Sequence, residues 1–440
     1  MTVTETTAFS EQFDRILLST ADRFPDWVSE LRQAAMQRFD RVGFPGSKWE
    51  DWRFTNISAI AKTSFSLGDC NASLPGVAES VDQAVLPDAA CRLVFVNGLF
   101  AAELSRFDDL QSGFAVENLA ADLAGPQPFV AGMFGRQANV EHSPFTALNT
   151  ALFRDGAVIR VAEGVHVEPT IQLVFVSTAG SDPIAAAPRN FIQLGRESRL
   201  RLVETHVGVS GEVYLTNSVT EIELGEYARL EHHKLQSDSI TAFHIASTFV
   251  SQADSSRYHN DYFAFGSALS RNEVQCYHVG ERVETVLNGL YMISGNQLAD
   301  CRTRIDHAMP NCTSHEMYKG VLDGHARGVF NGKIHVHPDA QKTDAKQSNQ
   351  ALLLSDDAVI DTKPELEIYA DDVRCTHGAT VGELDTQALF YLRSRGIPDP
   401  LARKILIFAF ANDVVQGLSV DSLKHHLESV LLADHGLPSV

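Results

Sequence analysis

The sequence predicts a mainly β protein, a β-solenoid with helical segments at both ends. Between about residues 154 and 384, short stretches of alternating apolar and polar residues are separated by Gly, Asp and Asn, and no helical pattern intervenes. Similar segments recur about every 30 residues, since LGRESRL begins at Leu194 and LGEYARL at Leu224. A strand with its turn takes about 15 residues, so this period fits one circuit of a two-sheeted coil.

A β-sandwich or a propeller is the alternative for the same strands. A sandwich needs tight hairpin turns, for which Asn-Gly and Asp-Gly pairs are the strongest local signal. The candidate pairs in this region are few: Asp155-Gly156, Asn288-Gly289, Asp323-Gly324 and Asn331-Gly332. Their scarcity favours the solenoid.

The N-terminal segment has the apolar spacing of helices from Ser10 to Arg41. Pro25 fits the first turn of a second helix there, because the missing N–H of proline has no helical partner at that position. The run Gly43-Phe44-Pro45-Gly46 then ends this helix. The first part of the chain is therefore expected to be helical.

Three further helices are expected after the strands. The first runs from Asp385 to Arg395, the second from Pro400 to about Gln416 with Asp399 as its cap, and the third starts at about Asp421. These patterns divide the chain into an N-terminal helical region (1–90), a connecting α/β segment (91–153), a solenoid core (154–384) and a C-terminal helical region (385–440).

The composition excludes several classes of partner. The chain has 440 residues with 36 basic and 56 acidic side chains, so its net charge is −20, which repels nucleic-acid phosphates and anionic membranes. It has no apolar run of the roughly 20 residues that cross a membrane, and its start does not resemble a secretory signal. Its six cysteines include no CxxC pair. We therefore expect a cytoplasmic protein with reduced thiols and no nucleic-acid or membrane partner.

The common motifs of catalysis are absent from the sequence. There is no GxxxxGK[ST] loop and no GxGxxG turn, so the chain is not expected to hydrolyse ATP by itself. There is also no GxSxG elbow, HExxH helix or EF-hand loop. The sequence thus gives no support for a hydrolase, a metalloprotease or a calcium-binding protein.

Histidines are concentrated in residues 301–340, which contain His307, His315, His325, His335 and His337. His335 and His337 are two residues apart on an expected strand, so both point to one face and form a candidate clamp for a divalent metal. A surface ladder of polar side chains is the alternative, and it is the interpretation that we favour for this tract.

Cys375-Thr376-His377 is the sharper chemical signal. On a strand the side chains of Cys375 and His377 project the same way, about 7 Å apart at their roots. A thiolate and an imidazole are suitable ligands for soft or borderline metals. Two ligands do not complete a site, and on the residues alone a buried cysteine beside a hydrogen-bonded histidine is the commoner arrangement.

Several segments taken together carry a family likeness. They are KWEDWRFTNIS (48–58), FTALNTALFRDGAVIRV (145–161), the stretch from KGVLDGHARGVFNGKIHVH to CTHGATVGELD (319–385) and ALFYLRSRGIP (388–398). These segments resemble the SufB/SufD family of iron–sulfur cluster assembly proteins over nearly the whole chain. His377 is followed by Gly378, as in the SufD branch, whereas SufB-like chains tend to have Glu there.

The resemblance implies a right-handed parallel β-helix with helical ends. It also implies a non-catalytic scaffold subunit of a SufBCD-type complex, joined to a SufB-like chain through the β-helix and to the SufC ATPase through the C-terminal helices. Cys375 and His377 would then lie at the SufB contact as tentative metal ligands shared with the partner chain. A nascent iron–sulfur cluster would form transiently there, and the isolated chain would hold no cofactor.

Other readings remain open at this point. The alternatives are a stand-alone metal-binding protein and a β-helix protein of the polysaccharide-lyase type, although the negative charge does not suit an acidic sugar. The sequence also leaves open whether the isolated chain is a homodimer, whether Cys375 is a direct ligand, whether the complex carries a reduced flavin and how iron arrives.

Overall fold

The computed structural model describes residues 9, 12–18, 23–70, 74, 76–107, 111–141 and 143–433. Residues 10 and 11, where the first helix was expected to begin, and residues 434–440 of the expected C-terminal region lie outside the described residues. Within the described part, no helix is both long enough and apolar enough to span a bilayer.

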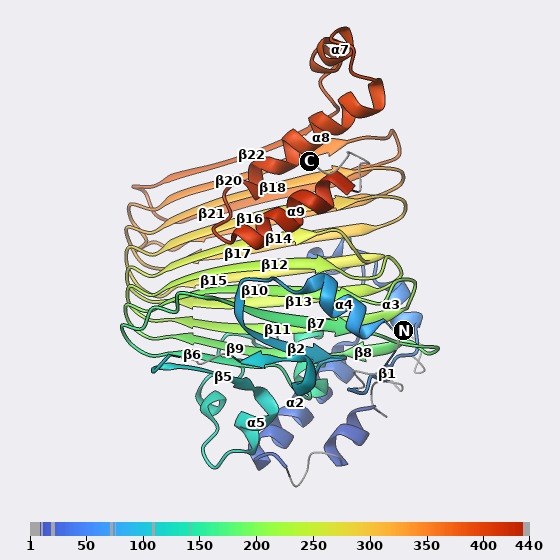
Figure 1. Cartoon of the computed structure of the whole chain (residues 1–440). Helices are drawn as coiled ribbons and strands as arrows, with labels where there is room; N and C mark the ends of the chain where they lie inside the picture. The colour runs from blue at the N-terminus through green and yellow to red at the C-terminus, as the bar shows by residue number, and fades with distance from the viewer. Residues whose placement is uncertain are drawn as a thin grey trace.

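Two eleven-stranded sheets form the body of the molecule (Figure 1). The first contains β21 (Val359–Ile368), β19 (Arg327–Val336), β17 (Leu298–His307), β15 (Leu269–His278), β13 (Phe243–Gln252), β11 (Tyr214–Leu224), β9 (Arg189–Leu194), β6 (Ala157–Val161) and β5 (Phe114–Asn118) in spatial order, with β8 (Ile184–Ala186) and β1 (Ser66–Leu67) beside them. The second contains β22 (Arg374–Gly382), β20 (Asp344–Leu353), β18 (Thr313–Leu322), β16 (Glu284–Ile293), β14 (Arg257–Ala264), β12 (Arg229–Ser237), β10 (Arg199–Gly208), β7 (Thr170–Ser177), β2 (Ala89–Val96) and β3 (Leu99–Phe100), with β4 (Arg106–Phe107) beside β2.

Consecutive strands from β9 to β22 alternate between the two sheets, and each strand up to β20 pairs in parallel with the next strand of its own sheet. This is a β-solenoid, as the repeat predicts. Arg199 of β10 lies beside Arg229 of β12, which is the 30-residue spacing of the LGRESRL and LGEYARL segments. Gly225 lies at the corner between β11 and β12, where an added Cβ atom would come within 2.9 Å of the backbone nitrogen of Arg196 on the preceding turn. Glycine therefore allows the turns to stack closely.

Two of the candidate hairpin pairs are not turns. Asn288-Gly289 lies within β16 and Asn331-Gly332 within β19. A Cβ atom on Gly289 would lie 2.3 Å from a ring carbon of Tyr318 on the adjacent turn of the coil. This glycine makes room for an interior aromatic ring, so packing between turns overrides the local turn signal.

The interior of the coil holds a large apolar core to which both sheets contribute. It contains Leu202, Leu230, Tyr258, Leu287 and Phe330, among other residues that are almost completely buried. Side chains that occupy equivalent positions on successive turns stack on one another, so every turn buries its neighbour's inner face. A single turn could not bury its apolar residues alone.

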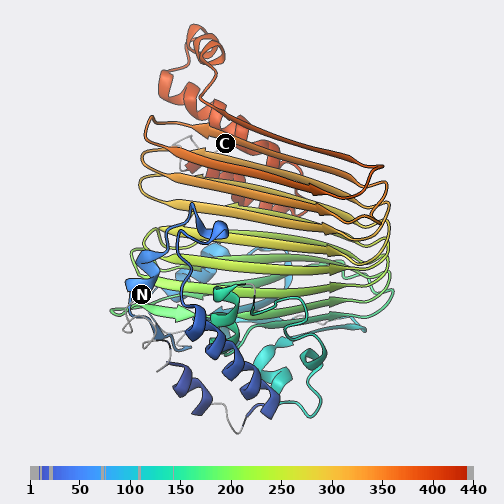
Figure 2. The same cartoon turned by 180° about the vertical axis from the view of Figure 1, so that it is seen from behind.

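Helices cover the outer faces of both sheets (Figure 2). The described helices are α2 (Asp26–Val42), α3 (Ser58–Lys62), α4 (Val77–Ala84), α5 (Leu119–Ala124), α6 (Pro144–Leu152), α7 (Thr386–Ser394), α8 (Asp399–Val415) and α9 (Asp421–Ala433), with short 3₁₀ turns at Glu50–Trp52, Ala102–Leu104 and Phe129–Gly132. All of them except α7 take part in this cover. Among the N-terminal helices, α4 packs on the second sheet. The others pack on the first sheet, where Trp52 stacks on Phe145 and lies under the guanidinium of Arg271. Pro25 directly precedes α2, close to its expected place.

The three expected C-terminal helices are confirmed to within a few residues. Asp399 is not the cap of α8, however, because the helix begins at this residue and Pro398 precedes it. The side chain of Asp385 caps α7 by accepting hydrogen bonds from the N–H groups of Gln387 and Ala388 at 2.8 and 3.2 Å. The apolar faces of α8 and α9 pack on the outer face of the second sheet, and Lys319 of β18 donates to Asp413 of α8 at 2.7 Å. In contrast, α7 stands beyond the last strand (Figure 1).

Candidate functional site

Cys375 and His377 lie on β22, the last strand of the second sheet. β22 pairs in parallel with β20, in a register that places Cys375 beside Ala345 and His377 beside Gln347. Ala345 and Gln347 are buried, with exposed fractions of 0% and 3%. Since aligned residues of a parallel ladder project to the same face, Cys375 and His377 face the interior of the coil at its final turn.

The final turn leaves the coil open. Among the described strands, β21 pairs only with β19 and β22 only with β20, so each has one unpaired edge. His377 is exposed there, whereas Gln347 on the preceding turn is buried. The two candidate ligands therefore lie at the mouth of the coil, within reach of a second molecule that covers it.

Cys375 is partly buried and packs against a small apolar cluster that includes Ala345 and Ala370. Burial raises the pKa of its thiol, an effect that the N–H of Ala345 opposes and the charge of Asp344 increases. In the isolated chain the sulfur is therefore mainly a protonated thiol at neutral pH rather than the thiolate that ligation requires. Binding of a metal at Cys375 must displace this proton.

A buried polar column continues inward from His377, and it was not identified from the sequence. Gln347, beside His377, donates a hydrogen bond to Oε2 of Glu316 at 2.6 Å, and the hydroxyl of Thr303 donates to the same oxygen at 3.1 Å. Glu316 is only 3% exposed. Burial raises the pKa of its carboxyl to about 7 despite these two hydrogen bonds. The alternation of Ser314, Glu316 and Tyr318 along β18 is the signal that places this acid on the inner face.

We expect Glu316→Gln to change how stability depends on pH. The pKa of Glu316 is about 7 in the folded chain against an ordinary value of 4.5, a difference worth on the order of 3 kcal/mol. Because the pKa of Glu316 is raised in the folded chain, its carboxyl does not lower the free energy of unfolding below pH 4.5. It lowers that free energy progressively as the pH rises from 4.5 to about 7. Urea unfolding should therefore show equal stability of parent and variant at pH 4.5, and a more stable variant at pH 8.

The exposed Glu163→Gln is the matched control for that measurement, because it removes the same charge outside the core. Its free energy of unfolding should equal that of the parent at both pH values. Equal stability of the Glu316 variant and the parent at pH 8 would show that the buried carboxyl is ionised there without cost.

The histidine tract does not form one cluster. His307 faces the core, where burial lowers its pKa to about 4 and its Nε2 lies 2.9 Å from the hydroxyl of Ser314. His315 and His325 are exposed on other parts of the surface. His335 and His337 do lie together, with ring centroids 4.5 Å apart, and Asp306 joins them. The expectation that these two histidines share a face is confirmed.

Comparison with known proteins decides the family. The SufBD core domain of the SUF system for iron–sulfur cluster assembly matches residues 175–410, and the SufBD N-terminal region matches residues 4–173. The chain belongs to the SufB/SufD family of iron–sulfur cluster assembly proteins. The family inferred from the four sequence segments is thus confirmed.

Individual members of the SufB/SufD family match along most of their length. An iron–sulfur cluster assembly SufBD family protein of Synechocystis is 34% identical over 90% of this chain and 88% of its own length. The iron–sulfur cluster assembly protein SufD of Escherichia coli is 31% identical over 91% of both chains. SufD of Bacillus subtilis is 26% identical over 92% of this chain and 94% of its own.

Proposed function

We propose that this chain is a non-catalytic scaffold subunit of a SufBCD-type complex, in which its open coil end pairs with a SufB-like chain. The observation that carries the proposal is the position of Cys375 and His377, which face inward at the mouth of a coil whose last strands have an unpaired edge. The relatives named SufD support it, since their names assign them to iron–sulfur cluster assembly.

The exposed edge of β22 is suited to pairing with another strand. Natural edge strands are usually protected by lysine, proline or a bulge. β21 carries Lys363 and Pro364, but β22 has neither residue type, and its Val381 is 50% exposed. A partner that adds a strand here would satisfy the free backbone groups and cover the apolar side chain. The same edge would join two copies of this chain if the isolated subunit forms a homodimer.

A proline at position 379 tests this pairing. The N–H of Arg374 donates to the carbonyl of Thr343 at 2.8 Å, and alternate residues of a parallel strand bond to opposite neighbours, so the N–H of Ala379 points to the open edge. Ala379→Pro removes that donor without breaking the ladder to β20. We expect the variant to fold but to lose co-elution with the SufB-like chain.

Ala379→Val is the matched control, because it adds similar bulk and keeps the N–H group. It should co-elute with the partner as the parent does. Pairing through the β22 edge would be refuted if the proline variant bound the SufB-like chain as tightly as the valine variant.

The cluster in this proposal is cargo that forms transiently between two chains. Cys375 and His377 offer one sulfur and one imidazole nitrogen, and the SufB-like chain would supply the remaining ligands. Contact with the partner would also remove Cys375 from solvent, so deprotonation of the thiol would have to accompany ligation. The six free cysteines agree with a reducing compartment, and we assign the chain to the cytoplasm.

We assign the docking of a SufC-like ATPase to α7. Phe390 and Tyr391 on this helix are 74% and 57% exposed, whereas α8 and α9 use their apolar faces to cover the second sheet. Adjacent exposed aromatic side chains on a projecting helix are typical of a protein contact. The ATPase would supply the nucleotide chemistry for which this chain has no sequence motif.

The double variant Phe390→Ser, Tyr391→Ser should abolish co-elution of the SufC-like ATPase. Because both side chains are exposed, its free energy of unfolding should stay within about 1 kcal/mol of the parent value. Ile240→Ser, at a residue that is 66% exposed elsewhere on the surface, should not affect co-elution. Retention of the ATPase by the double variant would rule out α7 as its docking site.

A further inference from the structure

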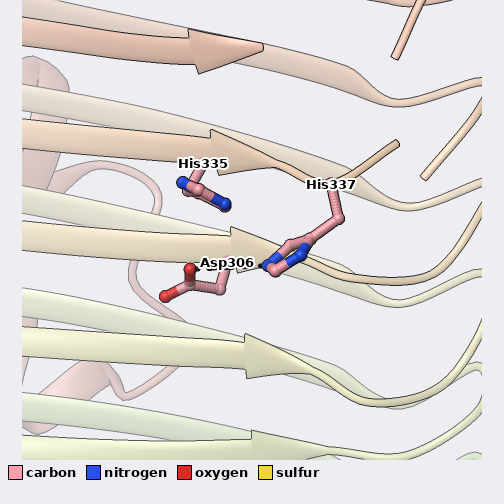
Figure 3. Close-up of side chains that lie close together, drawn as sticks. All are labelled: Asp306, His335 and His337. Carbon is pink, nitrogen blue, oxygen red and sulfur yellow. Dashed lines mark ion pairs between the residues drawn. The ribbon is translucent and has the colours of Figure 1, made fainter. Parts of the chain in front are cut away.

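We propose that Asp306, His335 and His337 form a binding site for a divalent transition-metal ion on the outer face of the first sheet. One potential ligand atom from each residue lies within 4.8 Å of the others, and Figure 3 shows the three side chains gathered on one side of neighbouring strands. The site is distinct from the coil mouth at Cys375 and His377, and the proposal does not depend on the proposed function.

The solenoid itself brings these residues together. Asp306 of β17 is in register with His335 of β19, so a step of 29 positions along the sequence completes one circuit of the coil. His337 lies two residues beyond His335 and projects to the same face. Its backbone N–H donates to the carbonyl of His307 at 2.9 Å, which continues the parallel ladder past the end of β19. All three side chains are therefore carried by backbone that hydrogen bonds hold in place.

The ring of His335 is oriented by a carboxylate, as in many metal sites. Its Nδ1 lies 2.9 Å from Oε2 of Glu367, the residue in register with it on β21. A carboxylate only accepts, so Nδ1 carries the proton and Nε2 keeps its lone pair for a metal. Lys333 donates to the other carboxylate oxygen of Glu367 at 2.8 Å, which holds this acceptor in position.

Asp306 is nearly buried, and Arg304 binds both of its oxygens. Arg304 Nε donates to Oδ2 at 2.7 Å and Nη2 donates to Oδ1 at 3.1 Å. Oδ1 is also 3.8 Å from Nε2 of His337. A metal ion on Oδ1 would replace only the longer of the two bonds from Arg304 and leave the shorter one to orient the carboxylate.

The surrounding charges indicate the class of ion. Arg304 and Lys333 balance the negative charges of Asp306 and Glu367, so no net negative field attracts a cation. Ca²⁺ and Mg²⁺ depend on several oxygen ligands and their charge, which this site does not offer. Two imidazoles with one carboxylate instead suit Zn²⁺, Fe²⁺ or Co²⁺.

The geometry allows such an ion after small side-chain rotations. Bonds of about 2.0 to 2.2 Å place neighbouring ligand atoms roughly 3 to 4 Å apart. The 3.8 Å between Nε2 of His337 and Oδ1 of Asp306 already lies in this range. The other ligand atoms lie within 4.8 Å of one another, so they must approach by about 1 to 2 Å. His337 is 43% exposed, so its ring has room to move. Water would complete the coordination on the solvent side.

Cobalt titration tests the proposal with the tag-free full-length chain in the background Cys375→Ala, His377→Ala, which removes the candidate ligands at the coil mouth. We expect one equivalent of Co²⁺ to give the visible absorption of a bound ion and to be displaced by Zn²⁺. His337→Ala should weaken Co²⁺ binding at least tenfold, and Glu367→Ala by about tenfold or more because it releases the ring of His335.

His315→Ala is the matched control, since it removes an exposed histidine of the same tract away from the cluster. Its Co²⁺ affinity should stay within twofold of the background protein. The proposal is overturned if the background protein binds no stoichiometric Co²⁺, which would leave a polar surface ladder, or if His337→Ala binds as tightly as His315→Ala. Circular dichroism melting checks that every variant is folded.

Discussion

Replacing His377 with alanine is expected to leave the subunit folded and its complex assembled, but to lower cluster formation by about tenfold or more. His377 is exposed on an edge strand, so its truncation removes little packing within the chain. Most contact residues at protein interfaces cost about 1 kcal/mol or less when truncated. Loss of an imidazole ligand, in contrast, leaves a shared site incomplete. Iron and acid-labile sulfide per complex after anaerobic reconstitution measure the effect.

The neighbour Thr376 provides the control for this variant, because it is also exposed on β22 and projects to the opposite face. Thr376→Ala should build clusters at the parental rate. Cys375→Ala should lower cluster formation as much as His377→Ala does if the thiol is a direct ligand. It should lower cluster formation less if the thiol only supports the site. A purified complex with His377→Ala that forms clusters at the parental rate would show that this histidine has no ligand role.

Replacing Leu202 with aspartate is expected to give insoluble protein. Leu202 is 0% exposed and lies in the interior core, between Ile171 and His232 of the adjacent turns. A carboxylate there would lie beside His232, whose Nε2 is already 3.1 Å from Glu204, so it would be buried without a free cationic partner at a cost of several kcal/mol. This is a large part of the stability of an ordinary domain. The soluble fraction after expression and the melting temperature of any soluble protein are the measurements.

Arg199→Asp controls for the added negative charge, because Arg199 is exposed at the start of the same strand. It should be soluble and melt within a few degrees of the parent. A Leu202→Asp variant that is as soluble and as thermally stable as Arg199→Asp would contradict the interior position of Leu202.

The solenoid could be predicted because its turns repeat in the sequence. The glycines of LGRESRL and LGEYARL stack at successive corners, so the 30-residue spacing is visible without any structure. The pairs Asn288-Gly289 and Asn331-Gly332 gave a wrong local signal for the opposite reason. Gly289 is required by the ring of Tyr318, which lies 29 residues away, and no local pattern reports such a contact.

The candidate site was only partly visible in the sequence. The spacing of Cys375 and His377 predicts that they share a face, but it does not show that this face is the interior or that the coil ends there. Glu316 was missed because glutamate is rarely buried, and its inner position depends on the register of three turns. Asp306 was missed as a neighbour of His335 because the two residues are 29 positions apart. They meet only because one circuit of the coil has this length at that turn.

Co-expression of this chain with its SufB-like and SufC-like candidates, followed by anaerobic purification and iron and sulfide analysis, tests the central claim most directly. The account predicts a stable complex that contains all three chains and forms a cluster on reconstitution, whereas the isolated chain forms none. A chain that elutes without either partner, or that assembles a cluster equally well by itself, would contradict the assignment of a scaffold whose site is completed by a partner.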